Sequence, residues 1–129
     1  MKNINEFKAS NKIKGFVGKL FEARQVAHAV HLQTTSYAQH MALNQFYDAL
    51  LLLVDSFVET WQGQYGLVSG YDVGATKMPE SIEKYLSDFA EEIKSVRKSM
   101  AEDDSHLQNI LDEMTSLVYS TVYKLKYLK

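Results

Sequence analysis

Apolar side chains recur every three or four positions along most of the chain, and this spacing predicts α-helices. Between residues 11 and 34 one such stripe predicts a first helix, and Ile4 and Phe7 could extend it toward the N-terminus. The stripe consists of Ile13, Phe16, Val17, Leu20, Phe21, Ala27 and Val30. A polar run ends this helix, and Ser36 or Thr35 is a suitable N-cap for the next one.

The second predicted helix spans residues 37–62 and is apolar around most of its circumference. A helix of this kind packs against more than one neighbour, and the second neighbour could be another subunit. Glycines then mark residues 63–78 as a loop long enough to cross from one end of a bundle to the other. Apolar stripes predict two further helices, at residues 79–101 and 105–127, and Pro79 opens the third helix.

Two helical hairpins joined by one long crossover make an all-α four-helix bundle with ferritin-like topology, as opposed to a simple up-down bundle. The length suits a single domain over residues 1–129. Cysteine is absent, which excludes disulfides and thiolate metal sites and fits a location in the cytoplasm. The longest apolar run, Ala49 to Val54, is too short for a membrane span, and the N-terminus predicts no signal peptide.

Charge is unevenly distributed, although the net charge is only −2. Residues 25–76 contain no lysine or arginine, but they contain three histidines and four carboxylates. Such a stretch would suit a cation site. It would equally suit a helix pair buried on several sides, where long basic side chains are disfavoured. Both interpretations stay open on the pattern alone.

The second helix carries a line of polar groups on one face. At about 100° per residue, His40, Asn44, Asp55 and Glu59 fall within one arc. His31 ends the first helix, and the short turn brings it to the same end of the hairpin as His40. Imidazole and carboxylate ligands suit Fe, Mn or Zn better than Ca or Mg. A lone histidine at a helix end is more often hydrogen-bonded to backbone, so the metal hypothesis needs the side chains to act together.

The order of these residues resembles the metal site of the Dps-like mini-ferritins. In that family a histidine ends the first helix, a second histidine follows in the second helix, and an Asp-x-x-x-Glu pair comes later in the same helix. His31, His40, Asp55 and Glu59 match these positions, and Asn44 stands where the family has an aspartate. The segments HLQTTSYAQHMAL and DSFVETWQGQYGL are similar, more narrowly, to a Dps-like family of tailed phages.

The resemblance implies a protein that binds iron, with Zn or Mn as alternatives, across a twofold interface. The histidines would come from one subunit and the Asp/Glu pair from the other, so the site requires at least a dimer, and the family's cage is a dodecamer. A redox-active centre would oxidise Fe(II) with peroxide or oxygen. The turn between His31 and His40 is tighter than in the family, and Asn44 removes one anionic ligand.

Two other functions fit a bundle of this kind. Because a four-helix bundle hosts many functions, the chain could be a structural or interaction protein that has lost the metal chemistry, such as a phage accessory protein in the host cytoplasm. Compaction of DNA is disfavoured by the net charge of −2 and by the lack of a concentrated basic face. No membrane partner and no organic cofactor are expected.

Overall fold

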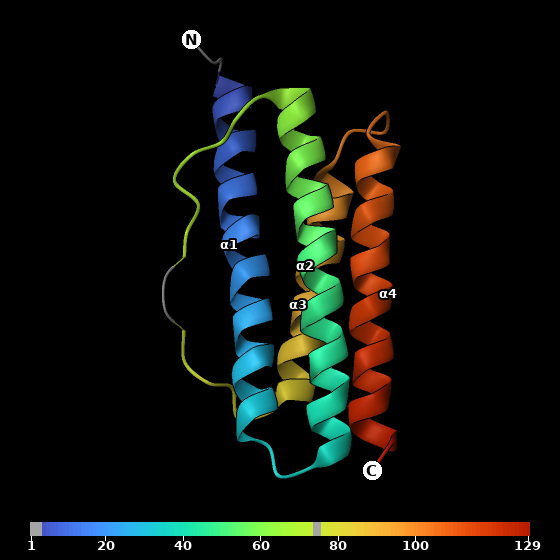
Figure 1. The fold of residues 1–129 in the computed structure, drawn as a ribbon. Helices are drawn as coiled ribbons and strands as arrows, with labels where there is room; N and C mark the ends of the chain where they lie inside the picture. Colours follow the sequence, from blue (N-terminus) through green and yellow to red (C-terminus); the bar gives the residue numbers. More distant parts are fainter. Residues whose placement is uncertain (1–3, 74–75) are drawn as a thin grey trace.

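The computed structural model describes residues 4–73 and 76–129, with side chains described from Asn11 onward within these ranges. Over this part of the chain it contains four helices and no strand: α1 (Ile4–Gln33), α2 (Tyr37–Tyr65), α3 (Ile82–Ser99) and α4 (Ser105–Tyr127). The prediction of an all-helical four-helix bundle is therefore confirmed. Figure 1 shows the helices aligned side by side, with α1 and α4 running down the view and α2 and α3 running up.

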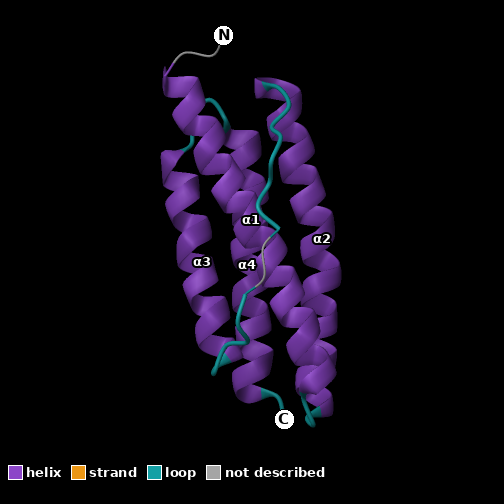
Figure 2. Ribbon diagram, turned by 90° about the vertical axis from the view of Figure 1, so that its left-hand side faces the viewer, coloured by secondary structure: helices purple, strands orange, loops and turns teal. Residues whose placement is uncertain are grey.

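A crossover, residues 66–81, leads from the end of α2 to the opposite end of the bundle, where α3 begins (Figures 1 and 2). Figure 2 shows it lying along the outer side of α1. The rings of Tyr71 and Phe21 meet edge to face with their centroids 6.2 Å apart. Gly18 faces the crossover so closely that a Cβ atom there would lie 2.9 Å from the Cβ atom of Asp72. The crossover thus covers one side of α1 and leaves the outer side of α2 uncovered.

Serine side chains set the starts of α2 and α3. Ser36 caps α2, and its Oγ accepts a hydrogen bond of 3.2 Å from the backbone N–H of Gln39. Ser81 caps α3 in the same way, so that this helix begins at Ile82. The prediction that Pro79 opens the third helix is therefore wrong. A serine oxygen two residues later satisfies the free N–H groups of the first turn, which proline cannot do.

Two other helix ends also differ from the sequence prediction, by three residues or more. α1 begins at Ile4, at the extended limit that the apolar pattern allowed. α2 continues past residue 62 to Tyr65 and ends at Gly66, which has a φ of +105°. Glycine adopts this backbone conformation without the steric penalty that a side chain brings. The extra turn carries Gln64 and Tyr65 to the end of the bundle, where they meet the turn between α3 and α4.

The core lies inside a ring of helices in which α2 packs against α1 on one side and α4 on the other, and α3 lies between α4 and α1. The prediction that the second helix has more than one neighbour is confirmed. Among the largest fully buried side chains are Phe46, Phe57, Phe89, Leu20, Leu43 and Leu50. By length and composition α2 could also span a membrane, although the core helix of a soluble protein passes the same criterion. The length of the Ala49–Val54 run was therefore an incomplete test for a membrane-spanning helix.

Candidate functional site

His31 and His40 lie face to face at the closed end of the α1–α2 hairpin. Their ring centroids are 3.6 Å apart and their planes differ by 17°. Nδ1 of His31 lies 2.7 Å from the carbonyl oxygen of His40, and Nδ1 of His40 lies 2.8 Å from the carbonyl oxygen of His31. Each Nδ1–H therefore donates to the other residue's backbone. We call this pair, His31 and His40, the histidine clasp.

The clasp follows from where the two residues lie in their helices. His31 is in the last turn of α1, where the carbonyl groups have no partner within the helix. The imidazole of His40, from the first turn of α2, satisfies one of them. Donation from Nδ1 leaves Nε2 of the neutral ring with its lone pair, the arrangement that metal-binding histidines commonly have. Hydrogen bonding to backbone, the alternative expected for helix-end histidines, is thus present and is compatible with a ligand role.

Asn44 is held by two neighbours on its own helix. Its Oδ1 accepts a hydrogen bond of 3.0 Å from the hydroxyl of Tyr47, and its Nδ2 donates one of 3.1 Å to Oδ2 of Asp48. Tyr47 also packs its ring against His28, with centroids 4.6 Å apart, and edge-on against His31 at 5.4 Å. A metal or water bound at Asn44 would have to compete with these contacts.

Asp55 and Glu59 lie far from the clasp within one chain. Both are exposed on α2, and Asp55 follows His40 by fifteen residues, a distance of about 22 Å along a helix. Within the described ranges, no three His, Asp or Glu side chains gather as a metal site. One subunit therefore brings His31 and His40 together and keeps the two carboxylates apart from them.

Asp55 borders a groove of about 370 Å³ between α1 and α2. Its other lining residues are Leu20, Phe21, Arg24, Gln25, His28, Leu51 and Val54. The Nε atom of Arg24 is buried there and has no hydrogen-bond partner among the residues that the structure describes. The helical pattern places Arg24 on the buried line of the first helix with Val17 and Leu20, but the sequence assigned it no functional role. Its positive charge shares the groove with Asp55.

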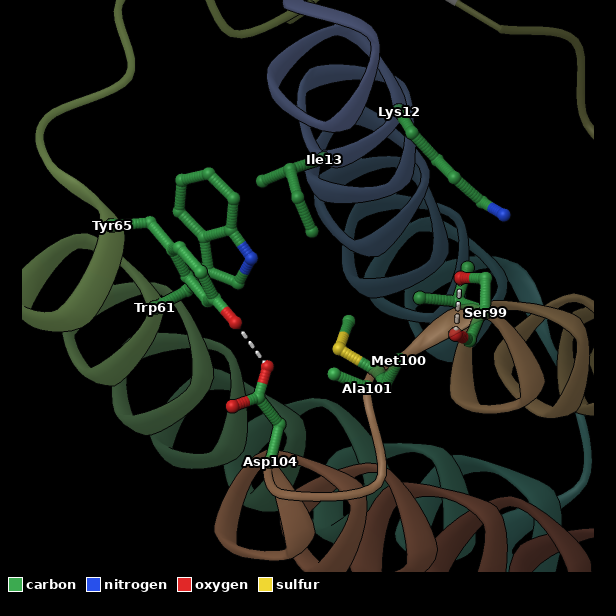
Figure 3. Close-up of a pocket in the computed structure, with 9 residues that line it drawn as sticks. Lys12, Ile13, Trp61, Tyr65, Ser99, Met100, Ala101 and Asp104 are labelled. Atoms are coloured by element: carbon green, nitrogen blue, oxygen red, sulfur yellow. Dashed lines mark hydrogen bonds between the residues drawn. The ribbon is translucent and has the colours of Figure 1, made fainter. Parts of the chain in front are cut away.

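A second polar cluster ties the far end of α2 to the turn before α4. The Asp104 side chain, in a residue only 4% exposed, accepts hydrogen bonds from the Tyr65 hydroxyl and, at 2.8 Å, from Nε2 of Gln64 (Figure 3). His106 donates from Nε2 to Oε1 of Gln64 at 2.8 Å. The hydrogen bond from Tyr65 lowers the pKa of Asp104 and raises the pKa of Tyr65.

These features define a four-helix bundle whose first hairpin is closed by a pair of histidines. The chain belongs to a family of unknown function (DUF5856), whose sequence model matches residues 31–125, a range that includes all five candidate ligands. It is also similar to an uncharacterised 14.6 kDa protein from the mobD-ri intergenic region of Enterobacteria phage T4, with 28% identity over 116 residues, covering 89% of this chain and 88% of that protein. No solved structure matches. The relationship to a phage protein agrees with the narrower resemblance, whereas kinship with the mini-ferritins stays a prediction.

Proposed function

We propose that this protein is a Dps-like, ferritin-like bundle that binds iron or a similar divalent metal between two subunits, in the cytoplasm of a phage host. His31 and His40 of one subunit would be ligands together with Asp55 and Glu59 of the other. Asn44 would act as a weak ligand or would hold a bound water. The observation that carries the proposal is the histidine clasp, which fixes two imidazoles by their Nδ1 atoms and leaves both Nε2 atoms available.

An antiparallel pair of α2 helices would bring the two halves of the site together. In a twofold dimer, each contact between two residues occurs twice. If the axis crosses α2 midway between His40 and the Asp55/Glu59 pair, near Asp48, then the clasp of each subunit lies level with the two carboxylates of the other. The distance of about 22 Å between His40 and Asp55 within one chain is then required for the two halves to meet across the axis. The same distance separates the two copies of the site in the dimer.

The outer face of α2 has the composition that such an interface needs. Leu52 is 70% exposed and lies about one helical turn from the proposed axis. Other apolar side chains exposed along the hairpin are Leu32, Tyr37, Met41 and Leu51. A row of exposed apolar side chains on a helix that also carries the carboxylates favours a second copy of the chain as the partner.

The donor set of nitrogen and oxygen atoms fits Fe, with Zn or Mn as alternatives. If the metal is Fe(II) and the site is redox-active, each Fe(II) would lose one electron, and peroxide would take up electrons and protons and leave as water. The protein's own residues would hold the ion and limit its access to solvent. Asn44 provides less negative charge than an aspartate would, so we expect weaker metal binding than with a fully anionic site.

The alternative is a bundle that mediates protein contacts and binds no metal. Two observations favour it: the positively charged Arg24 shares a groove with Asp55, and both polar atoms of Asn44 are already hydrogen-bonded. In this case the outer face of α2 would still form an interface, but the clasp would only close the hairpin.

Metal titration distinguishes the two functions. Wild-type protein is titrated with Zn(II), and anaerobically with Fe(II), by calorimetry, and the bound metal is counted by elemental analysis. Our proposal predicts stoichiometric binding that is lost in His40→Asn and in Asp55→Asn but retained in the control His106→Ala, which lies outside the hairpin. A protein that binds no metal at about 50 µM, a weak affinity for a dedicated site, and still elutes as a dimer would support the alternative.

A further inference from the structure

The charged side chains on the outer face of α2 are all acidic. Asp48, Asp55 and Glu59 are exposed along this helix, and residues 25–76 contain no lysine or arginine. In the twofold dimer of the proposed function the axis passes near Asp48, so the Asp48 carboxylates of the two copies would lie close together. Like charges that face each other across an interface weaken it. Such a dimer therefore requires a cation beside Asp48, and a neighbouring helix has to supply it.

Arg24 of α1 is a cation at this level of the bundle. The rings of His28 and Tyr47 meet with their centroids 4.6 Å apart. Nearer the start of α1, the rings of Phe16 and Phe57 meet at 5.6 Å. Because Arg24 lies between His28 and Phe16 in α1 and nearer to His28, it is level with the middle of α2, just past Tyr47. The groove that Arg24 lines between α1 and α2 lies at the same level.

Arg24 also lacks an acceptor. Its Nε atom is buried and has no hydrogen-bond partner among the residues that the structure describes. None of the ion pairs within the described ranges includes Arg24, although Asp55 borders the same groove. A guanidinium stays charged in proteins, and its planar fork of donors matches a carboxylate. A carboxylate that enters the groove from outside the chain is therefore a suitable partner.

Asp48 of a second copy provides such a carboxylate. Its side chain is exposed, and only its Oδ2 accepts a hydrogen bond within the described ranges, from Nδ2 of Asn44 at 3.1 Å. A second cation lies beside α2, on α4, but this Lys124 already donates to Oε1 of Gln45 at 2.8 Å. Of these two cations, Arg24 is the one without a partner.

We propose that two copies of the chain dock groove to groove, so that Arg24 of each copy forms an ion pair with Asp48 of the other. By twofold symmetry the contact occurs twice. The inference rests on the dimer of the proposed function and adds the contact that fixes the position of its axis. The crossover leaves this side of α2 uncovered (Figure 2). Docking also covers the exposed Leu51 and Leu52, and removal of water around the charges strengthens their attraction.

Charge reversal tests the pair through the dissociation constant of the dimer. The constant is measured by sedimentation equilibrium over a dilution series, with a chelator present so that metal does not contribute. Arg24→Glu and Asp48→Arg should each raise it at least about tenfold, because like charges then face each other. The double variant, Arg24→Glu with Asp48→Arg, restores opposite charges and should return to within about threefold of wild type.

A neutral set of variants covers the case in which Arg24→Glu disturbs the fold, which circular dichroism monitors. Arg24→Gln and Asp48→Asn should each weaken the dimer, and the two together should weaken it little more than either alone. Lys124→Glu is the matched control, since it reverses a charge on the other side of α2. It should change the dissociation constant less than about threefold, and it should not rescue Asp48→Arg.

The outcomes separate this contact from the proposed function. If wild-type protein is a dimer that Leu52→Glu dissociates, but the charge variants leave it intact or the double variant is no tighter than the single ones, then the ion pair is refuted and the dimer stands. Rescue of Asp48→Arg by Lys124→Glu would assign the contact to the wrong cation. A wild-type protein that stays monomeric at about 100 µM overturns both the ion pair and the dimer on which it rests.

Discussion

Replacement of His31 by alanine tests whether the histidine clasp stabilises the hairpin. His31 is 7% exposed, donates a 2.7 Å hydrogen bond to the carbonyl of His40, and contacts the rings of His40 and Tyr47. The lost hydrogen bond contributes about 1 kcal/mol, and each ring contact contributes about 0.5–1.5 kcal/mol. We therefore expect His31→Ala to lower the free energy of unfolding by about 2–4 kcal/mol.

An asparagine at the same position separates the stabilising role from the metal role. The amide nitrogen of Asn lies where Nδ1 of His31 lies, so His31→Asn should keep the donor to the His40 carbonyl and recover about 1 kcal/mol. It has no group at the position of Nε2, so it should bind metal no better than His31→Ala. Stability is measured by urea unfolding, followed by circular dichroism, with linear extrapolation to water.

His28→Ala is the matched control for these two variants. His28 is exposed, contacts the Tyr47 ring and makes no hydrogen bond among the described residues, so we expect a loss below about 1 kcal/mol. If His31→Ala is no less stable than His28→Ala, or if His31→Asn recovers nothing, then the reciprocal hydrogen bonds do not stabilise the hairpin and the argument for fixed imidazoles is wrong.

Three further predictions concern other parts of the bundle. The pKa of Asp104 is lowered in the folded protein, so the stability that its carboxylate contributes is complete above the unfolded-state pKa of about 3.9 and is lost as the pH falls through the folded-state pKa. Asp104→Asn should therefore lower the free energy of unfolding by about 1–2 kcal/mol at neutral pH and by progressively less in acid. Urea unfolding at a series of pH values measures this difference. Gly15→Ala should stabilise by about 0.5–1 kcal/mol, because nothing lies within 4 Å of the new Cβ atom, whereas Gly18→Ala should destabilise, because its Cβ atom would meet Asp72 of the crossover. Leu52→Glu places a charge in the proposed α2 interface and should therefore give a folded monomer, as measured by light scattering.

Each of these predictions has a control and an outcome that contradicts it. Asp103→Asn, next to Asp104 but exposed, should change stability little at any pH, and an equal loss in both variants would remove the special role of the buried carboxylate. Gly15→Ala and Gly18→Ala control each other, and equal effects would mean that the crossover does not pack on α1. Leu67→Glu changes an apolar residue that is 85% exposed in the crossover, and monomers with this variant would refute α2 as the interface.

The helices and their order could be predicted from the sequence, because a helix that buries one face leaves a periodic stripe. Ser36 was recognisable as an N-cap because a serine just before a helical stripe is a local sequence signal. Pro79 misled the prediction because a proline suits a first helical turn without requiring one, while the capping oxygen of Ser81 decided the start. The end of α2 at Gly66 extends the helix by one turn beyond its apolar pattern.

The candidate site was only partly accessible to sequence reasoning. The proximity of His31 and His40 follows from a short turn between the helices. Their reciprocal hydrogen bonds depend on how α1 and α2 are rotated relative to each other, which the apolar periodicity does not define. The contact of Asp104 with Tyr65 joins residues 39 positions apart, and Arg24 reaches the groove of Asp55 from a different helix. Such contacts have no pattern along the chain, because tertiary packing creates them.

The most direct test of a metal site shared between subunits is complementation between two inactive variants. One variant, His31→Asn with His40→Asn, lacks the imidazole ligands, and the other, Asp55→Asn with Glu59→Gln, lacks the carboxylates. Neither should bind Zn(II) or Fe(II) alone. After the two are unfolded and refolded together, mixed dimers contain one complete site, so we predict that metal binding returns, at one site for each mixed dimer. If wild-type protein binds metal but the mixture does not, then the ligands do not come from two subunits and the account is contradicted.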